Sequence, residues 1–319
     1  MCSSENIRIA YMNARKGKLH YSDVQKIDSN TDYYVEKLRQ MLSGGHFSTS
    51  NYQVIQKHTG SKVRIIHKLP FFPDRIVHHC IVQVVQKMWI SSLIRDTYST
   101  IPGRGIHDGV KRIKKAMNDT EGTRYCLKID VKKYYPSIDP DILKSIVRKK
   151  IKDTKMLALI DNIIDSSEGI PIGNYLSQWF GNLYLNYFDH YCKQQLKCKY
   201  YYRYCDDVVI LSESKEFLHG VLIAMNHYLE SELHLSINEN YQIFPVDSRG
   251  VDFLGYRFFH GYTLVRKRIV TKMKRRLANK NANARRKSAG SYYGWLKHAN
   301  AYRLTTKYIQ NERTIRQTA

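Results

Sequence analysis

The chain has 319 residues, 43% of them hydrophobic, which is enough for a real core and for more than one lobe. It carries 52 Lys and Arg against 28 Asp and Glu, and this net charge of +24 indicates a polyanionic partner, with nucleic acid the leading class. No apolar run approaches membrane-spanning length, the first residues lack the apolar core of a signal peptide, and six cysteines without a CxxC spacing fit reduced thiols, so we expect a cytoplasmic protein with no membrane partner.

The predicted elements follow the periodicity of apolar residues along the chain. Residues 1 to about 60 read as mostly helical and polar, and alternation over 62–67 predicts a strand. After these, we expect helices over 75–94, near 140–165, from the Gly169–Gly173 turn to about 194 and over about 215–231, and then short strands through 250–258.

Asp130 follows a short alternating run. Leu127 and Ile129 alternate with polar residues, so Asp130 is predicted to end a strand. Taken alone, Asp130 is better explained as a strand-end cap than as a functional residue. Its interpretation therefore depends on which other carboxylates lie near it in the sheet.

Two adjacent aspartates lie where two β-branched and aromatic runs meet. The stretch Tyr202-Arg203-Tyr204-Cys205-Asp206-Asp207-Val208-Val209-Ile210-Leu211 reads as two strands with Asp206 and Asp207 at the hairpin tip. Two carboxylates there repel each other unless a cation lies between them, and oxygen ligands suit Mg²⁺. On its own, the pair is equally consistent with a solvated Asp-Asp turn.

The three aspartates gain a joint meaning if their strands are neighbours in one sheet. Asp130, Asp206 and Asp207 would then hold two Mg²⁺ ions. That arrangement serves in-line phosphoryl transfer, in which one metal activates a 3′-hydroxyl and the other holds the triphosphate.

The chain changes character from Arg266 onward. Basic residues recur to its end, with Glu312 as the only acid. A charge run is usually a solvated face, but one this one-sided is more often a phosphate-binding surface. The residues we expect to contact nucleic acid are Lys272, Arg275, Arg276, Arg285 and Arg286.

Taken together, these segments resemble a reverse transcriptase. A strand ending in Asp130, a helix opened by Gly173, the Tyr204-Cys205-Asp206-Asp207 hairpin and Phe253-Leu254-Gly255 follow the order and spacing of that family's palm motifs over roughly residues 50–260. The resemblance implies an α+β right-hand polymerase with fingers, a palm with an antiparallel sheet, and a helical thumb. It implies RNA-templated DNA synthesis from dNTPs with two Mg²⁺ ions, or Mn²⁺ in their place, and the backbone carbonyl of Val131 as a further metal ligand.

The resemblance also assigns the nucleotide site. Tyr135, five positions after Asp130, takes the place of the steric gate that excludes a 2′-hydroxyl, and Lys62 and Arg64 fall on the strand that grips the triphosphate. Gly173 would let the backbone approach the nascent base pair. Each has a plainer explanation: a core aromatic, a solvated strand residue, a helix-entry turn. The implied dNTP site comprises Lys62, Arg64, Tyr135, Ile172, Gly173 and Gln178, and Leu254 and Gly255 would contact nucleic acid.

One departure from the general pattern narrows the family. Ile172 precedes Gly173 where many reverse transcriptases have Gln, and Gln178 follows Ser177 where many have Pro. This looks like the reverse transcriptases of diversity-generating retroelements, as does the segment Ser291–Ala299. In that family the enzyme copies a template RNA into cDNA with errors mainly opposite adenine, and a small basic barrel-shaped accessory protein binds it.

The expected organisation is fingers with part of the palm over 1–125, palm over 126–260 and a basic thumb over 261–319. A defence-type or retron-like reverse transcriptase is the alternative within enzymes. A catalytically silent RNA-binding scaffold is the alternative outside them, and the three repelling carboxylates argue against it.

Overall fold

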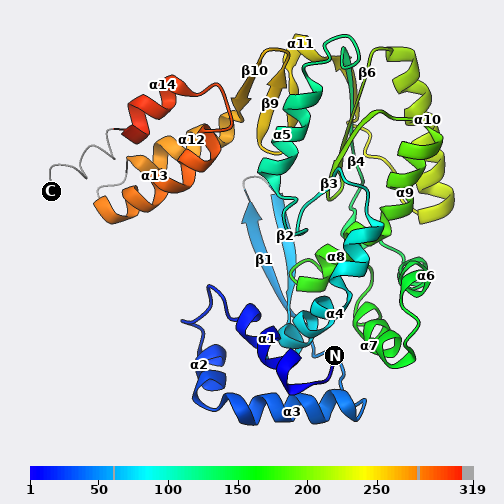
Figure 1. The fold of residues 1–319 in the computed structure, drawn as a ribbon, viewed down its shortest axis with the longest axis vertical. Helices are drawn as coiled ribbons and strands as arrows, with labels where there is room; N and C mark the ends of the chain where they lie inside the picture. Colours follow the sequence, from blue (N-terminus) through cyan, green and yellow to red (C-terminus); the bar gives the residue numbers. More distant parts are fainter. Residues whose placement is uncertain (60–61, 279–280, 311–319) are drawn as a thin grey trace. The chain divides into compact units, whose positions relative to one another are not determined.

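The computed structural model describes residues 1–59, 62–278 and 281–310, and the fold is mixed α+β, as the sequence predicted (Figure 1). The chain divides into two compact units. The first comprises Met1–Arg95, Val131–Tyr191 and His227–Ser236, and the second comprises Asp96–Asp130, Cys192–Asn226 and the described residues from Ile237 onward. None of the helices in the described ranges combines the length and apolarity needed to cross a bilayer. The fingers, palm and thumb boundaries remain a prediction.

Helices dominate the first unit. The apolar period of α4 places Ile76, Cys80 and Trp89 in its core, each at most 1% exposed. Its helices are α1 (Ser4–Ala14), α2 (Ser22–Ser29), α3 (Thr31–Ser43), α4 (Ile76–Ser92), α6 (Pro140–Lys150), α7 (Thr154–Ile164), α8 (Tyr175–Tyr184) and α9 (Asn186–His190), and α10 (Lys215–Leu233) begins in the second unit and ends in this one.

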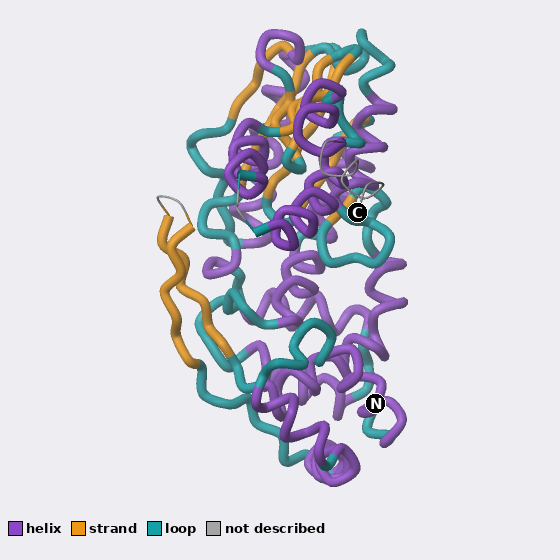
Figure 2. The backbone as a smooth tube through the Cα atoms, turned by 90° about the vertical axis from the view of Figure 1, so that its left-hand side faces the viewer, coloured by secondary structure: helices purple, strands orange, loops and turns teal. Residues whose placement is uncertain are grey.

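The first unit also carries a two-stranded hairpin, the isolated pair of orange strands in Figure 2. Strand β1 (Gln53–Thr59) pairs antiparallel with β2 (Lys62–Lys68). Both faces of the ribbon are open to solvent, since the consecutive residues Val54 and Ile55, which point to opposite faces, are 59% and 40% exposed. The prediction of a strand over 62–67 is confirmed, but 53–59 is a strand rather than helical, because its β-branched residues pair with β2.

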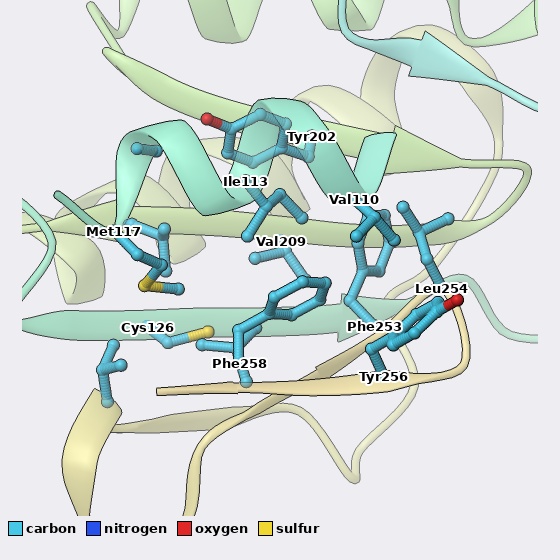
Figure 3. Packing of buried hydrophobic residues seen from close by; sticks show 14 of the residues in the cluster. Val110, Ile113, Met117, Cys126, Tyr202, Val209, Phe253, Leu254, Tyr256 and Phe258 are labelled. Carbon is cyan, nitrogen blue, oxygen red and sulfur yellow. The ribbon is translucent and has the colours of Figure 1, made fainter. Parts of the chain in front are cut away.

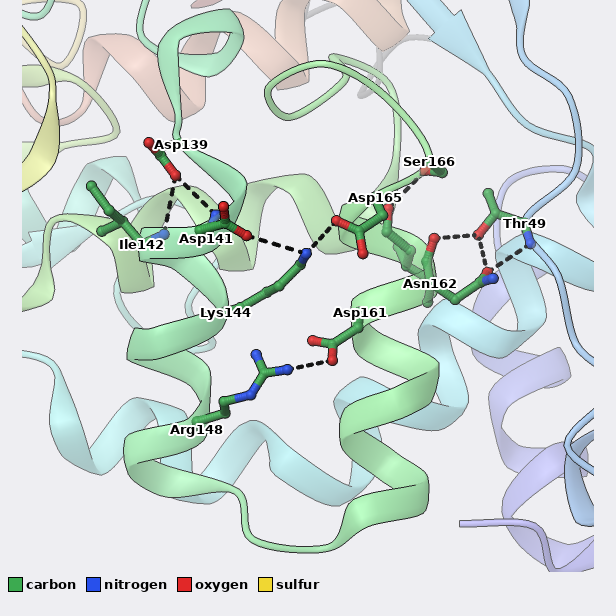
Figure 4. A network of polar contacts seen from close by, with 11 residues as sticks. Thr49, Asp139, Asp141, Ile142, Lys144, Arg148, Asp161, Asn162, Asp165 and Ser166 are labelled. Carbon is green, nitrogen blue, oxygen red and sulfur yellow. Dashed lines mark hydrogen bonds and ion pairs between the residues drawn. The ribbon is translucent and has the colours of Figure 1, made fainter.

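Two predicted helices are interrupted. The expected helix near 140–165 is two helices, because the side chain of Asp153 accepts a hydrogen bond from the Met156 amide and starts α7 anew. The helix expected from Gly169 begins only at Tyr175. Side-chain pairs then join α6 to α7, with Arg148 bonded to Asp161 and Lys144 to Asp165, while the Thr49 amide donates to Asn162 Oδ1 (Figure 4).

The second unit is built on a five-stranded sheet. Its strand order is β3 (Thr97–Tyr98), β5 (Tyr200–Tyr204), β6 (Asp207–Ser212), β4 (Tyr125–Asp130) and β7 (Gln242–Pro245), antiparallel except for the β3–β5 pair. The strand ending at Asp130 and the hairpin around Asp206 are both confirmed. Because β4 pairs directly with β6, the predicted neighbourhood of these strands is also confirmed.

One apolar cluster joins helix α5 to the two sheets of this unit (Figure 3). Helix α5 (Ile106–Ala116) contributes Val110 and Ile113, the large sheet contributes Tyr202 and Val209, and a small sheet contributes Phe253 and its neighbours. The small sheet is β8 (Val251–Phe253), β9 (Tyr256–Phe259) and β10 (Tyr262–Val265), one hairpin longer than the strands predicted to 258.

The basic C-terminal segment forms helices, as expected. They are α12 (Lys267–Leu277), α13 (Ala282–Leu296) and α14 (Tyr302–Thr305), while a single turn, α11 (Val246–Arg249), precedes β8. Met273 and Leu277 of α12 pack into their common core, whereas Lys272, Arg275 and Arg276 lie exposed on the other face. The amphipathic pattern therefore leaves the cations to solvent.

Two hairpin turns allow a matched test of backbone strain. Gly255 and Gly261 each occupy the second position of a two-residue turn, with φ of +84° and +83°. A Cβ on Gly255 would lie 2.5 Å from the Trp295 ring, whereas nothing lies within 4 Å at Gly261. We expect Gly261→Ala to cost roughly 1–2 kcal/mol for the left-handed conformation alone. Gly255→Ala should cost about 1–3 kcal/mol more because Trp295 must move. Chemical denaturation measures both, and equal losses would contradict the packing argument.

Candidate active site

Strand pairing brings the three predicted aspartates to one end of the large sheet. Asp130 ends β4, and its register partner on β6 is Asp207. Asp207 is also paired with Tyr204 across the hairpin, which leaves Cys205 and Asp206 as the turn. Cys205 has a φ of +54°, a left-handed conformation that a non-glycine residue adopts only where the surroundings hold it. The turn therefore places Asp206 beside the end of β4.

The carboxyl groups of Asp130 and Asp206 are close enough to share a hydrogen bond. Burial, followed by the charge of Asp130, raises the pKa of Asp206 to about 6. Without a cation, Asp206 therefore holds its proton more tightly than an isolated carboxyl does. A divalent cation is the natural replacement for that proton.

Asp207 has a different environment. Lys128, two residues before Asp130 on β4, places Nζ 3.5 Å from Asp207 Oδ1, at ion-pair distance but without hydrogen-bond geometry. That buried oxygen has no hydrogen-bond partner among the described residues. Burial is the largest cause that raises the pKa of Asp207 to about 7, and Lys128 only partly opposes it. The carboxylate is thus under-stabilised in this structure.

Arg203 was not predicted as part of the site. Its side chain is fully buried on β5, and Nη1 donates to the carbonyl oxygen of Cys205 at 2.8 Å. The guanidinium therefore holds the backbone of the turn at Cys205. Its charge also lowers the pKa of Asp206, but burial has the larger and opposite effect. The sequence did carry a signal for both residues. Arg203 is a cation two residues before the turn, and Lys128 lies two residues before Asp130, which places it on the same face of the strand.

The donor chemistry suits a hard cation. Three carboxylates supply only oxygen, two of them lie within hydrogen-bonding reach of each other, and Asp207 Oδ1 has no hydrogen-bond partner among the described residues. The part of the chain that the structure describes contains no set of three carboxylate, imidazole or thiol side chains already gathered into a metal cage. Side-chain adjustment of Asp207 away from Lys128 would be required to complete one. Val131, the proposed carbonyl ligand, is buried and follows Asp130 directly.

The residues predicted to bind dNTP lie in the first unit. Of the adjacent residues Tyr134 and Tyr135, Tyr134 is the one in the core. It is 2% exposed, and its hydroxyl donates a hydrogen bond to the Gly181 carbonyl oxygen. Tyr135 is only half-buried, and a Cβ on Gly181 would lie 3.1 Å from its ring. The tyrosine predicted as the steric gate is therefore the accessible one, seated on a glycine of α8.

The entrance to α8 is fixed by the β1–β2 hairpin. The His67 amide donates to the Ile172 carbonyl at 2.9 Å. Gly173 has a φ of +131°, and a Cβ there would lie 2.6 Å from the His67 carbonyl oxygen. Glycine is thus required by the protein backbone itself, which is a structural reason independent of any substrate. Its predicted approach to a base pair remains a prediction.

The remaining predicted residues are distributed as follows. Arg64 is exposed on β2 opposite Lys57, Gln178 is half-buried on α8, and the side chain of Lys62 lies outside the described residues. In the second unit, Leu254 is 7% exposed, so any contact with nucleic acid at Leu254 and Gly255 would use the turn backbone. The structure brings together the three aspartates in one unit, and Tyr135, Ile172, Gly173, Gln178 and the hairpin in the other.

Residues 55–258 match a family model described as "Reverse transcriptase (RNA-dependent DNA polymerase)". Among curated proteins, Protein YkfC of Escherichia coli (strain K12) is 25% identical, with 72% of this chain and 71% of that protein covered. Group II intron-encoded protein LtrA of Lactococcus lactis subsp. cremoris is also 25% identical, over 54% of this chain and 30% of that protein.

Solved telomerase structures share the fold. The telomerase from Candida albicans in complex with a fragment of telomeric RNA has a TM-score of 0.53 at 10% identity and covers 73% of this chain. The telomerase from Candida tropicalis in a similar complex has a TM-score of 0.54 at 12% identity and covers 82%. This chain spans about half of those chains, 51% and 55% respectively.

The raised pKa of Asp206 predicts a stability effect with a defined sign. A carboxyl whose folded pKa is about 6 binds its proton more tightly in the folded state, so stability falls as pH rises from about 4 to about 6 and stays lower above that. In chelator at pH 8, we expect Asp206→Asn to stabilise the protein by roughly 2–3 kcal/mol, with no gain at pH 4. Thermal melting measures the difference. The exposed Glu213→Gln is the charge-matched control, and an equal gain there would contradict the prediction.

Proposed function

This chain belongs to the reverse transcriptase family of RNA-dependent DNA polymerases, and we propose that it copies a template RNA into cDNA for a diversity-generating retroelement. The enzyme class is RNA-directed DNA polymerase, a nucleotidyltransferase. The observation that carries the finer proposal is Ile172, an aliphatic side chain at the entrance to α8 where many family members have Gln. The proposed cDNA is error-prone, with misincorporation mainly opposite template adenine.

The catalytic proposal rests on the carboxylates at the end of the large sheet. Asp130, Asp206 and Asp207, with the backbone carbonyl of Val131, would hold two Mg²⁺ ions, or Mn²⁺ in their place. Those ions supply charge stabilisation for the attacking 3′-hydroxyl oxygen and for the leaving pyrophosphate. Arg203 acts as a positioning residue, because it holds the turn that presents Asp206, whereas Lys128 is the ion-pair partner that Asp207 would leave when the metal binds.

Nucleotide selection is proposed to lie in the first unit. The half-exposed ring of Tyr135 would exclude a ribose 2′-hydroxyl and so select dNTPs. Exposed Arg64, with Lys62 and Gln178, would contact the nucleotide, since Arg suits bidentate phosphate contacts. Gly173 keeps the α8 entrance close to β2, which holds Ile172 in a fixed place.

The contacts with nucleic acid are proposed to come from the basic C-terminal helices. The exposed cations of α12, namely Lys272, Arg275 and Arg276, and Arg286 of α13 offer phosphate contacts, with Arg285 half-buried beside them. The template RNA and its cDNA are the expected ligands. The small basic accessory protein of the retroelement is the expected protein partner.

A group II intron-type reverse transcriptase is a second candidate function. The curated relatives include a group II intron-encoded protein, which favours an intron-type enzyme. Fidelity separates the two, because an intron-type enzyme has no need for errors at adenine. A defence-type or retron-like enzyme would likewise show no adenine bias. A silent scaffold is opposed by the repelling carboxylates, which a binding protein would not need to retain.

We expect Asp206→Asn to lower the rate of primer extension by roughly three orders of magnitude, because the loss of metal charge stabilisation costs several kcal/mol in the transition state. Binding of RNA should change little, since Asp206 lies away from the basic helices in sequence and adds no positive charge. Primer extension and RNA binding are measured on the same preparations, with Glu213→Gln as the control. Robust extension by the Asn variant would overturn the catalytic assignment.

The adenine bias gives a separate prediction. An aliphatic Ile172 offers no hydrogen bond to reward correct geometry, and shape alone supplies only about 1–3 kcal/mol of discrimination. Wild-type enzyme should therefore misincorporate more often opposite adenine than opposite other bases, and Ile172→Gln should reduce those errors. Sequencing of cDNA from one RNA template, with and without the accessory protein, measures both. Equal error rates at all four bases would remove the retroelement proposal and leave a generic reverse transcriptase.

A further inference from the structure

A cavity of about 400 Å³ lies within the first unit, among the segment before α2, the start of α4 and the entrance to α8. Cations and aromatic rings dominate its wall. The cations and rings that line the cavity include Lys18, Tyr21, Lys68, Arg75, His78 and Tyr175. Gly173 also lines it, so the cavity adjoins the α8 entrance.

The positive charges in this wall are not neutralised by the protein. Within residues 1–59, 62–278 and 281–310, no carboxylate forms an ion pair with Lys18, Lys68 or Arg75, and Asp23 is the only acid that lines the cavity. Arg75 is half-buried, and its Nε has no hydrogen-bond partner in that part of the chain. Burial of an unpaired guanidinium is unfavourable unless an anion accompanies it.

The pKa shifts of Arg75 and Lys18 and the environment of His78 support this conclusion. Burial lowers the pKa of Arg75, and burial together with the charge of Arg75 lowers the pKa of Lys18, so the charged form of each is less stabilised in this wall than in water. His78 is 2% exposed, and its Nε2 also has no partner among the described residues. Burial, followed by the charges of His79 and Arg75, lowers the pKa of His78 to about 3, so its ring is neutral. A neutral imidazole N–H can still donate a hydrogen bond.

We propose that this cavity is a phosphate-binding site for a nucleotide unit, with Arg75 and Lys18 as its charged contacts. Arg75 presents a planar fork suited to phosphate oxygens, and Lys18 and Lys68 add point charges from other segments. Tyr21, 42% exposed, offers a face for the sugar or base. One face of Tyr175 is already stacked on His79 at 4.0 Å between ring centroids. The volume suits a single nucleotide unit.

The phosphate has two conceivable sources, and this choice alone rests on the proposed polymerase function. One is a phosphodiester of a nucleic-acid strand, and the other is a free nucleotide. Both present the same chemistry to Arg75 and Lys18. A strand would make the site contribute to RNA affinity, whereas a free nucleotide would make it contribute to the KM for dNTP.

The experiment compares Lys18→Gln and Arg75→Gln with Lys16→Gln. Lys16 lies two residues from Lys18 in the same segment and is exposed, but does not line the cavity, so it controls for the loss of one charge. Binding of a fluorescein-labelled oligouridylate is measured by anisotropy at several salt concentrations, and the KM for dNTP is measured by primer extension. Because Arg75 is half-buried, its variant is first checked by thermal melting. The half-exposed Lys18 keeps the test valid if Arg75→Gln does not fold.

If a strand occupies the cavity, Lys18→Gln weakens oligouridylate binding by about tenfold relative to Lys16→Gln, and the log–log salt slope falls by about one. If a free nucleotide occupies it, the KM for dNTP rises instead and the strand affinity matches the control. Either result supports the phosphate site. Affinity and KM both equal to those of Lys16→Gln would overturn it, whereas the polymerase assignment would still stand or fall on Asp206→Asn alone.

Discussion

The repulsion between partly buried carboxylates at one end of the large sheet is the constraint on which the second unit depends. Strand register leaves Asp130 and Asp207 side by side and the turn adds Asp206, so the fold gathers negative charge where burial penalises it. Lys128 and the buried Arg203 offset part of that charge without neutralising it. The apolar cluster of α5 and the two sheets must supply the stability that this arrangement costs. The surroundings of these carboxylates therefore leave part of their negative charge uncompensated.

Local patterns in the sequence predicted the central strands of the five-stranded sheet well. Alternation before Asp130 and the aromatic and β-branched runs around Asp206 each require only a few neighbouring residues to read. The structure adds what a single sequence does not carry, namely which strands pair. That is why Gln53–Thr59 was mistaken for helix, since its strand character depends on β2. Arg203 was missed for a related reason, because its burial follows from packing on both faces of β5.

At the α8 entrance, two independent explanations account for a glycine at position 173. The family resemblance assigns Gly173 to the substrate, whereas the structure shows that its φ and the nearby His67 carbonyl already demand glycine. The same backbone contact ties Ile172 to β2. The side chain at position 172 can therefore vary among related enzymes while its backbone stays fixed, which separates the selectivity of the pocket from its framework.

The turn between β5 and β6 has a consequence for chemical modification. Four of the six thiols, those of Cys80, Cys126, Cys192 and Cys198, are buried, whereas Cys2 and Cys205 are partly accessible. The Sγ of Cys205 donates to Ser99 Oγ at 3.1 Å. Maleimides and oxidants reach accessible thiols first. An adduct on Cys205 would lie directly beside Asp206 in the turn, so it would crowd the carboxylates at this end of the sheet. The same thiol offers an attachment point for a spectroscopic label next to Asp206 and Asp207.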